Sequence, residues 1–146
     1  MHNYQAATDA LKDKVILVTG AGDGIGKEAA LTYARFGASV ILLGKTVSKL
    51  TAVYDEIVAS GGKEPAIVPL DLKGATAKHY RDMAATITAE FGKLDGVLHN
   101  AAMLGPLTPL QMYDPDTWDD VMNVNLRAPF QLTQALLPLL PPSLPP

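Results

Sequence analysis

The chain has 146 residues, of which 48% are hydrophobic and 18% are charged, with a net charge of −3 and no cysteine. This length and composition fit one globular domain with a substantial core. The lack of cysteine excludes disulfides and thiolate metal sites, and the isolated histidines offer no metal-ligand spacing. The slight negative charge gives no basic footprint for nucleic acid. We therefore expect a cytoplasmic protein with no metal centre and no nucleic-acid partner.

Neither end of the sequence reads as a membrane segment. Residues 1–14 are polar and mixed in charge, unlike a signal peptide. The most apolar stretch, residues 132–140, is too short to cross a bilayer and is interrupted by Pro138. We therefore expect no membrane contact.

Apolar runs alternate with segments of helical spacing along the chain. The predicted strands, nearly continuous in apolar residues as buried parallel strands are, cover residues 15–19, 39–43, 66–70 and 94–99. The predicted helices cover residues 25–36, 48–60, 76–91 and 116–137. A proline-containing loop, 105–115, precedes the last helix.

This alternation predicts a three-layer α/β/α Rossmann-like domain over residues 1–137. We expect a parallel sheet in the strand order 3-2-1-4, because strand–helix–strand units connect by right-handed crossovers. Residues 138–146 contain five prolines and are predicted to form a tail outside the domain.

Helical spacing also predicts which side chains share a face. The stripe of the first helix is Ile25, Ala29, Tyr33 and Phe36, and that of the third is Tyr80, Met83, Ala84, Ile87 and Phe91. In the last helix, we expect Trp118 and the leucines after it to lie in the core or in an interface.

A glycine-rich run, Thr19-Gly20-Ala21-Gly22-Asp23-Gly24-Ile25-Gly26, joins the first strand to the first helix. The amides and the dipole of a helix N-terminus favour anions, and glycines let a ligand approach the backbone. The Walker A pattern fails here, because Ala21 stands where its first glycine belongs and Glu28 follows the lysine. Gly-x-Gly-x-x-Gly fails too, which leaves Gly20-x-x-x-Gly24-x-Gly26.

With Thr19 and Ile25, this loop resembles the Thr-Gly-x-x-x-Gly-Ile-Gly loop of short-chain dehydrogenases/reductases. Three further segments resemble motifs of that family in the same order: Asp71-Leu72 after the third strand, His99-Asn100-Ala101-Ala102 after the fourth, and Asn123-Val124-Asn125 in the last helix. The resemblance covers roughly residues 11–137. The runs 95–101 and 134–140 are similar to a bacterial branch, the YciK-like oxidoreductases.

The resemblance implies an oxidoreductase that uses a nicotinamide dinucleotide to interconvert a carbonyl and an alcohol on a small-molecule substrate. It implies these cofactor-binding residues: Thr19, Gly20, Asp23, Gly24, Ile25, Gly26, Lys45, Asp71, Leu72, Asn100, Ala101 and Ala102. Within the family, Asp71 would face the adenine edge, while Asn100 would tie neighbouring strands together and face the ribose. Asp71 could instead serve only as a turn or capping residue.

The implied catalytic residue is Asn125, whose main-chain carbonyl would hold a water molecule of the proton relay. A free carbonyl inside a helix requires a local distortion, which we therefore expect around Asn125. An ordinary helical asparagine is the alternative. We expect His99 to be packed or hydrogen-bonded rather than catalytic.

The end of the second strand, Leu42-Leu43-Gly44-Lys45-Thr46, favours NADP over NAD. In Rossmann folds an acid at this point binds the ribose hydroxyls and repels a 2′-phosphate, whereas a basic residue accepts the phosphate. Here no acid is present and Lys45 supplies positive charge. Two observations point the other way: Lys45 could be a solvated turn lysine, and Asp23 is acidic where many NADP-preferring members are basic.

The family mechanism also needs a serine and a tyrosine with a lysine four positions later. None of the five tyrosines here has such a lysine, so no residue receives the acid/base role. We expect a truncated or frame-shifted gene product in which strand 94–99 is a sheet edge and the last helix offers a face for homo-oligomers. Two functions stay open, an NADP-dependent dehydrogenase/reductase and a catalytically inactive nucleotide-binding fragment.

Overall fold

A parallel sheet of four strands forms the middle layer of the computed structural model, which describes residues 3–142. The strands are β1 (Val15–Thr19), β2 (Ser39–Gly44), β3 (Ala66–Pro69) and β4 (Gly96–Leu98). Their order is β3-β2-β1-β4, and all three pairings are parallel. The predicted Rossmann-like α/β class and the predicted strand order are both confirmed.

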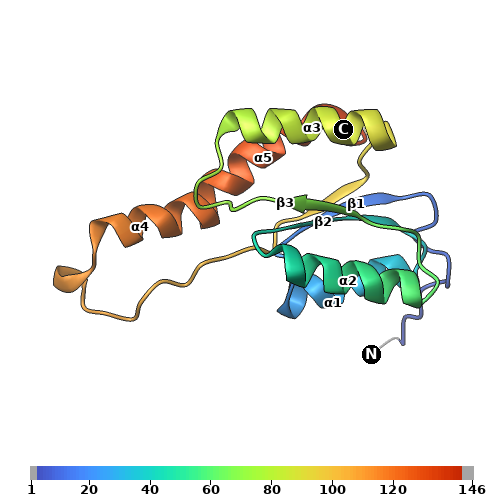
Figure 1. The fold of residues 1–146 in the computed structure, drawn as a ribbon, viewed down its shortest axis with the longest axis horizontal. Helices are drawn as coiled ribbons and strands as arrows, with labels where there is room; N and C mark the ends of the chain where they lie inside the picture. The colour runs from blue at the N-terminus through green and yellow to red at the C-terminus, as the bar shows by residue number, and fades with distance from the viewer. Residues whose placement is uncertain (1–2, 143–146) are drawn as a thin grey trace.

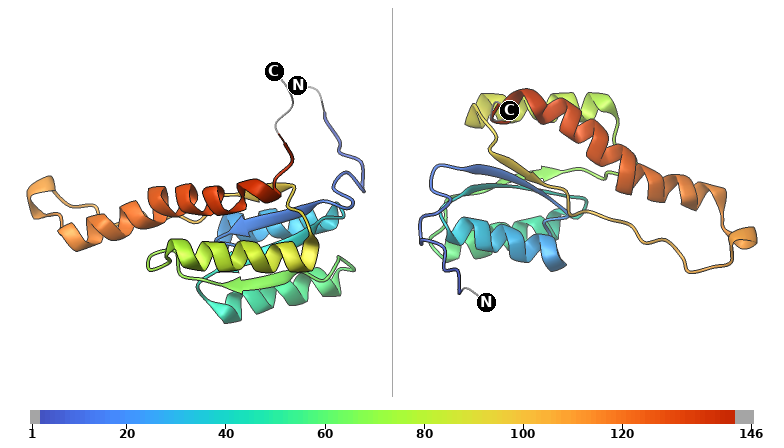
Figure 2. Two further views of the ribbon diagram at one scale, coloured as in Figure 1. Left: turned by 90° about the horizontal axis from the view of Figure 1, so that it is seen from above. Right: turned by 180° about the vertical axis from the view of Figure 1, so that it is seen from behind.

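Helices cover both faces of this sheet (Figure 1). The helices α1 (Gly24–Arg35) and α2 (Val47–Ala59) lie on one face, and α3 (Ala77–Phe91) and α5 (Ala128–Leu136) lie on the other. The helix α4 (Pro115–Met122) continues the line of α5 and extends beyond the end of the sheet, as Figure 2 shows from two sides. Within the described residues, no helix has both the length and the apolar character needed to span a bilayer.

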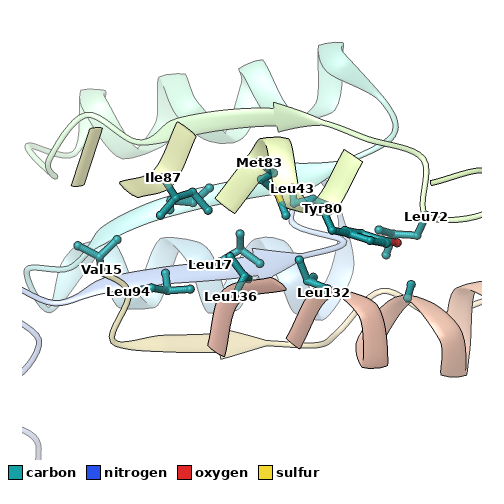
Figure 3. Packing of buried hydrophobic residues seen from close by; sticks show 12 residues of the cluster. Val15, Leu17, Leu43, Leu72, Tyr80, Met83, Ile87, Leu94, Leu132 and Leu136 are labelled. Carbon is teal, nitrogen blue, oxygen red and sulfur yellow. The ribbon is translucent and has the colours of Figure 1, made fainter. Parts of the chain in front are cut away.

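The core consists of two buried clusters, one on each face of the sheet, as the all-apolar strands require. Leu17 and Leu43 point towards α3 and α5, where Tyr80 and Leu132 meet them (Figure 3). Ile41 belongs to the same cluster. Alternate residues of the same strands, among them Val18, Val40 and Leu42, pack against α1 and α2. Because helices cover both faces of the sheet, a ligand can reach it only at the ends of the strands.

The predicted apolar stripe of α1 is confirmed at Tyr33, which packs against the buried cluster under this helix, and is wrong at Ile25. The buried residues of α1 are Gly26, Ala30 and Ala34, whereas Ile25 is 79% exposed. The reason is steric, because small residues spaced four apart let the helix axis approach the sheet closely. For α3 the predicted stripe is confirmed in its buried members, Tyr80, Met83 and Ile87, since large side chains fill a wider gap there.

The segment predicted as one helix, 116–137, is interrupted. Between α4 and α5 the chain forms one π-helical turn, η2 (Asn123–Arg127), and after α5 it tightens into a 3₁₀ turn, η3 (Leu137–Leu139). Trp118 is 53% exposed and therefore not a core residue. The core face of α5 consists instead of Ala128, Leu132 and Leu136, all of which are buried.

The predicted proline-rich tail, 138–146, is described only in part, because residues 143–146 lie outside the described residues. Leu139 and Leu140 pack against the cluster between the sheet and α3. The amide of Leu94 donates a hydrogen bond of 3.0 Å to the carbonyl of Leu139. This stretch of chain therefore contacts the domain immediately before β4.

Candidate functional site

The glycine-rich loop between β1 and α1 has the backbone of an anion-binding turn. Gly20 and Gly24 adopt left-handed conformations, with φ of 64° and 53°, which other residues rarely adopt. A Cβ at Gly26 would overlap the carbonyl oxygen of Gly20, so only glycine lets the first turn of α1 fold back on the loop. Asp23 caps α1 by accepting a hydrogen bond of 2.8 Å from the amide of Gly24.

A hydrogen-bond network joins this loop to the end of β4. The buried Thr19 Oγ1 accepts from the amides of Asn100 and Ala101, both at 3.0 Å, and donates to the carbonyl of Leu98 at 3.4 Å. The side-chain Nδ2 of Asn100 donates hydrogen bonds to the carbonyls of Thr19 and Gly20, at 3.1 and 3.4 Å. The network agrees with the strand-tying role expected for Asn100, and it places Thr19 beneath the loop.

A cavity of about 510 Å³ opens at the carboxyl ends of the strands, where ligands of open α/β sheets bind. Seven of the predicted cofactor-binding residues line it: Gly20, Lys45, Asp71, Leu72, Asn100, Ala101 and Ala102. Leu43, Met103 and Val124 also line it and were not predicted. These three are apolar, and their only signal in the sequence was their position next to a predicted motif.

Asp71 is fixed in the turn that follows β3. Its Oδ1 accepts a hydrogen bond of 3.0 Å from the amide of Lys73, and its carbonyl accepts one of 3.3 Å from Gly74. Such a turn is typical of aspartate, so Asp71 has the turn role that the sequence offered as an alternative to cofactor binding. The same turn also holds Asp71 in the wall of the cavity.

A smaller cavity of about 150 Å³ adjoins the first and contains charged residues on both sides. Lys45 and Lys49 line it together with Asp23, and Lys49 Nζ lies 2.8 Å from Asp23 Oδ2. The hydrogen bond from Lys49, helped by the one from the amide of Gly24, lowers the pKa of Asp23 below its ordinary value. Asp23 therefore stays ionised and forms an ion pair with Lys49.

Sequence reasoning missed Lys49, although a signal was present. The residue follows Lys45 by four positions and falls in the first turn of α2, which begins at Val47. A basic residue just inside the helix after β2 faces the same edge of the sheet as one in the preceding turn. Its partner, Asp23, belongs to a segment distant in sequence, so the ion pair itself could not be foreseen.

Asn125 lies in the π-helical turn η2, which agrees with the distortion expected around it. Both ends of its side chain engage the backbone of Met103: Oδ1 accepts from the amide and Nδ2 donates to the carbonyl, each at 2.8 Å. The side chain thus fixes the segment after β4 to the last helix. The catalytic role of its carbonyl stays a prediction.

Four of the predicted cofactor-binding residues line neither cavity. Gly24, Ile25 and Gly26 form the first turn of α1, and Thr19 is buried below them. His99 donates to or accepts from Thr133 Oγ1 at 2.8 Å, and burial lowers the pKa of its imidazole. Across residues 3–142, no three acidic or histidine side chains gather in a way that could hold a metal ion.

The family model for short chain dehydrogenases matches residues 14–143. The chain therefore belongs to the short-chain dehydrogenase family, which confirms the resemblance drawn from its motifs. It is 51% identical over 140 residues to the oxidoreductase YciK of Escherichia coli K12, a match that covers 96% of this chain and 55% of YciK. The predicted similarity to YciK-like oxidoreductases is thus confirmed.

Solved structures of short chain dehydrogenases have the same fold as this chain. A short chain dehydrogenase from Pseudomonas syringae superposes with a TM-score of 0.91 at 51% identity, covering 95% of this chain and 57% of that one. One from Shigella flexneri, complexed with NADP, superposes with a TM-score of 0.88 at 50% identity, covering 91% and 56%. The chain spans about half the length of these relatives.

Proposed function

We propose that this chain binds NADP(H) along the carboxyl edge of its sheet, as the cofactor-binding part of an oxidoreductase that interconverts a carbonyl and an alcohol. The observation that carries the proposal is the pair of adjoining cavities between the glycine-rich loop and the loop after β2. Their volumes, about 510 and 150 Å³, together fall in the range of ligand pockets.

The residues present fit a dinucleotide. The cradle formed by Gly20 and Gly26 is one that a Cβ would fill, and it lies at the N-terminus of α1, where a diphosphate is favoured. Asp71 and Leu72 lie in the wall where the adenine would rest. Lys45 and Lys49 lie where a 2′-phosphate would be received. When bound, the nicotinamide would carry the hydride, and this chain's residues would position it.

NADP in preference to NAD is supported by charge. The loop after β2 carries no acid, and two lysines line the small cavity beside it. Asp23, which counted against NADP, is paired with Lys49. A further relative from Escherichia coli CFT073, 51% identical, is complexed with NADPH. A carbonyl or alcohol substrate is proposed from the family alone.

A second function, nucleotide binding without turnover, is favoured by one observation. No tyrosine of the 146 residues is followed by lysine at the fourth position, so none of these tyrosines forms an acid/base pair of the family's kind. The two functions separate in one assay. NADPH binding with steady NADPH oxidation over a panel of ketones and aldehydes supports the first, and binding without oxidation supports the second.

Calorimetric titration with NADPH and with NADH tests the cofactor. We expect tighter binding of NADPH, and a Lys45→Gln variant should lose about tenfold in NADPH affinity, equivalent to ~1.4 kcal/mol, with little change for NADH. Lys78→Gln, an exposed lysine of α3, is the matched control. Tighter binding of NADH, or an unaffected Lys45→Gln variant, would refute the preference for NADP.

A further inference from the structure

A separate polar cavity of about 210 Å³ lies beneath the connection between β3 and α3. Its wall is formed by Lys73 and the first turn of α3 on one side, and by η2 and α5 on the other. It shares Leu72 and Lys73 with the nucleotide cavity but contains none of the glycine-rich loop. The proposed cofactor therefore leaves it unexplained.

The floor of this cavity contains a buried hydroxyl without a partner. Tyr80 is 1% exposed, and its hydroxyl forms no hydrogen bond with any described residue. Figure 3 shows the ring lying among the core side chains with its oxygen directed towards Leu72, which lines the same cavity. An unsatisfied buried hydroxyl costs about 1–3 kcal/mol, so a polar occupant that accepts a hydrogen bond from it is favoured.

The mouth of the cavity carries an excess of hydrogen-bond donors. Arg127 forms no ion pair within residues 3–142, and its guanidinium has five donors and no acceptor. Asn123 and Gln131 lie one turn before and one turn after it, and both line the cavity. Lys73 also lines it, and its ammonium lies 3.2 Å from Asp120 Oδ2.

We propose that this cavity is a site for a small oxyanion, a phosphate or a carboxylate, held between Arg127 at its mouth and the Tyr80 hydroxyl at its floor. The planar guanidinium matches two oxygens of either group, and the phenol donates to a third or to the same oxygen. Burial raises the pKa of Tyr80, so its hydroxyl keeps the proton it donates.

Thermal unfolding at constant pH and ionic strength tests the site, with sodium chloride replaced stepwise by sodium phosphate or by sodium acetate. We expect a saturable rise in Tm of about 4 °C with at least one of these anions. The rise should disappear in Tyr80→Phe and in Arg127→Gln. Arg81→Gln, an exposed arginine next to Tyr80 on α3, is the matched control and should keep it.

Phosphate could also bind the glycine-rich loop, and the variants distinguish the two places because neither Tyr80 nor Arg127 lines that cavity. A Tm rise that persists in Tyr80→Phe and Arg127→Gln would overturn the proposal. The absence of any rise in the unmodified chain would overturn it too. The unmodified chain could also fail to bind NADPH and still show an anion-dependent rise in Tm that Tyr80→Phe and Arg127→Gln remove. That result would refute the proposed cofactor and leave the anion site standing.

Discussion

Thr19 shows how one hydroxyl can hold two strand ends together. It is buried, and its oxygen accepts from the amides of Asn100 and Ala101. Thr19→Val keeps the shape but leaves both amides without their acceptor, so we expect the free energy of unfolding to fall by about 2 kcal/mol. Urea denaturation measures this. Thr86→Val, which removes an exposed hydroxyl of α3, should change stability by less than ~0.5 kcal/mol.

Asp95 holds the start of β1 through its carboxylate, which accepts from the amide of Val15 at 2.8 Å and lies 3.0 Å from Lys93 Nζ. Burial opposes ionisation, but the hydrogen bonds from Val15 and Lys93 outweigh it and lower the pKa of Asp95 below 3.8. A lowered carboxyl pKa stabilises the folded chain above the unfolded value, and this stabilisation is lost as pH falls through the folded value.

We therefore expect Asp95→Asn to cost about 1–2 kcal/mol at neutral pH and progressively less as the pH falls below 3.8. Chemical denaturation at a series of pH values measures the difference between the two proteins. Asp55→Asn, an exposed residue of α2, serves as the control. A difference that stays constant into strong acid would show that the ionised carboxylate is not what stabilises this strand.

Among the elements, α1 depends on a glycine that a helix would ordinarily disfavour. Replacing a helical glycine with alanine usually gains up to ~1 kcal/mol, but a Cβ at Gly26 overlaps the Gly20 carbonyl. We expect Gly26→Ala to destabilise the fold by more than ~2 kcal/mol and to abolish NADPH binding. Gly96→Ala, where a Cβ meets nothing within 4 Å, is the control. Equal effects at the two positions would contradict the argument.

The side chain of Asn125 joins the π-helical turn η2 to the segment that follows β4. Asn125→Ala removes both hydrogen bonds to Met103, and we expect the segment between β4 and α4 to open more often. Hydrogen exchange should then quicken at Met103 by about tenfold, as expected for the loss of ~1.4 kcal/mol of local stability. Gln134→Ala, an exposed residue of α5, should leave that exchange unchanged.

These elements also show where sequence reasoning succeeds and where it stops. The strands and their order were predictable, because parallel strands buried on both faces are continuous apolar runs. The glycine-rich loop was predictable because its backbone excludes other residues. The buried face of α1 was not, since glycine and alanine gain importance only once the helix lies against the sheet. The pairs Lys49 with Asp23 and Asn125 with Met103 join distant segments, and neither leaves a local pattern.

At the scale of the whole molecule, the long last helical segment presents an apolar face that the domain does not cover. Trp118, Leu126 and Phe130 are 53%, 61% and 63% exposed, and they line one shallow hollow along α4, η2 and α5. Figure 2 shows α4 continuing from α5 and extending past the sheet, away from α1, α2 and α3. Asp119, Asn123 and Arg127 also line this hollow. Its exposed apolar side chains favour association, because burying apolar surface stabilises a contact by about 25 cal/mol per Å².

We therefore expect this chain to self-associate reversibly through that face. Sedimentation velocity over a hundredfold range of concentration should show a rising mean mass, and Phe130→Lys should suppress the rise by placing a charge in the contact. Val58→Lys, an apolar residue of α2 that is 46% exposed, should not suppress it. If both lysine variants reduced association equally, general charge repulsion would explain the result. If Val58→Lys alone acted, the contact would lie on the opposite face of the sheet, over α2.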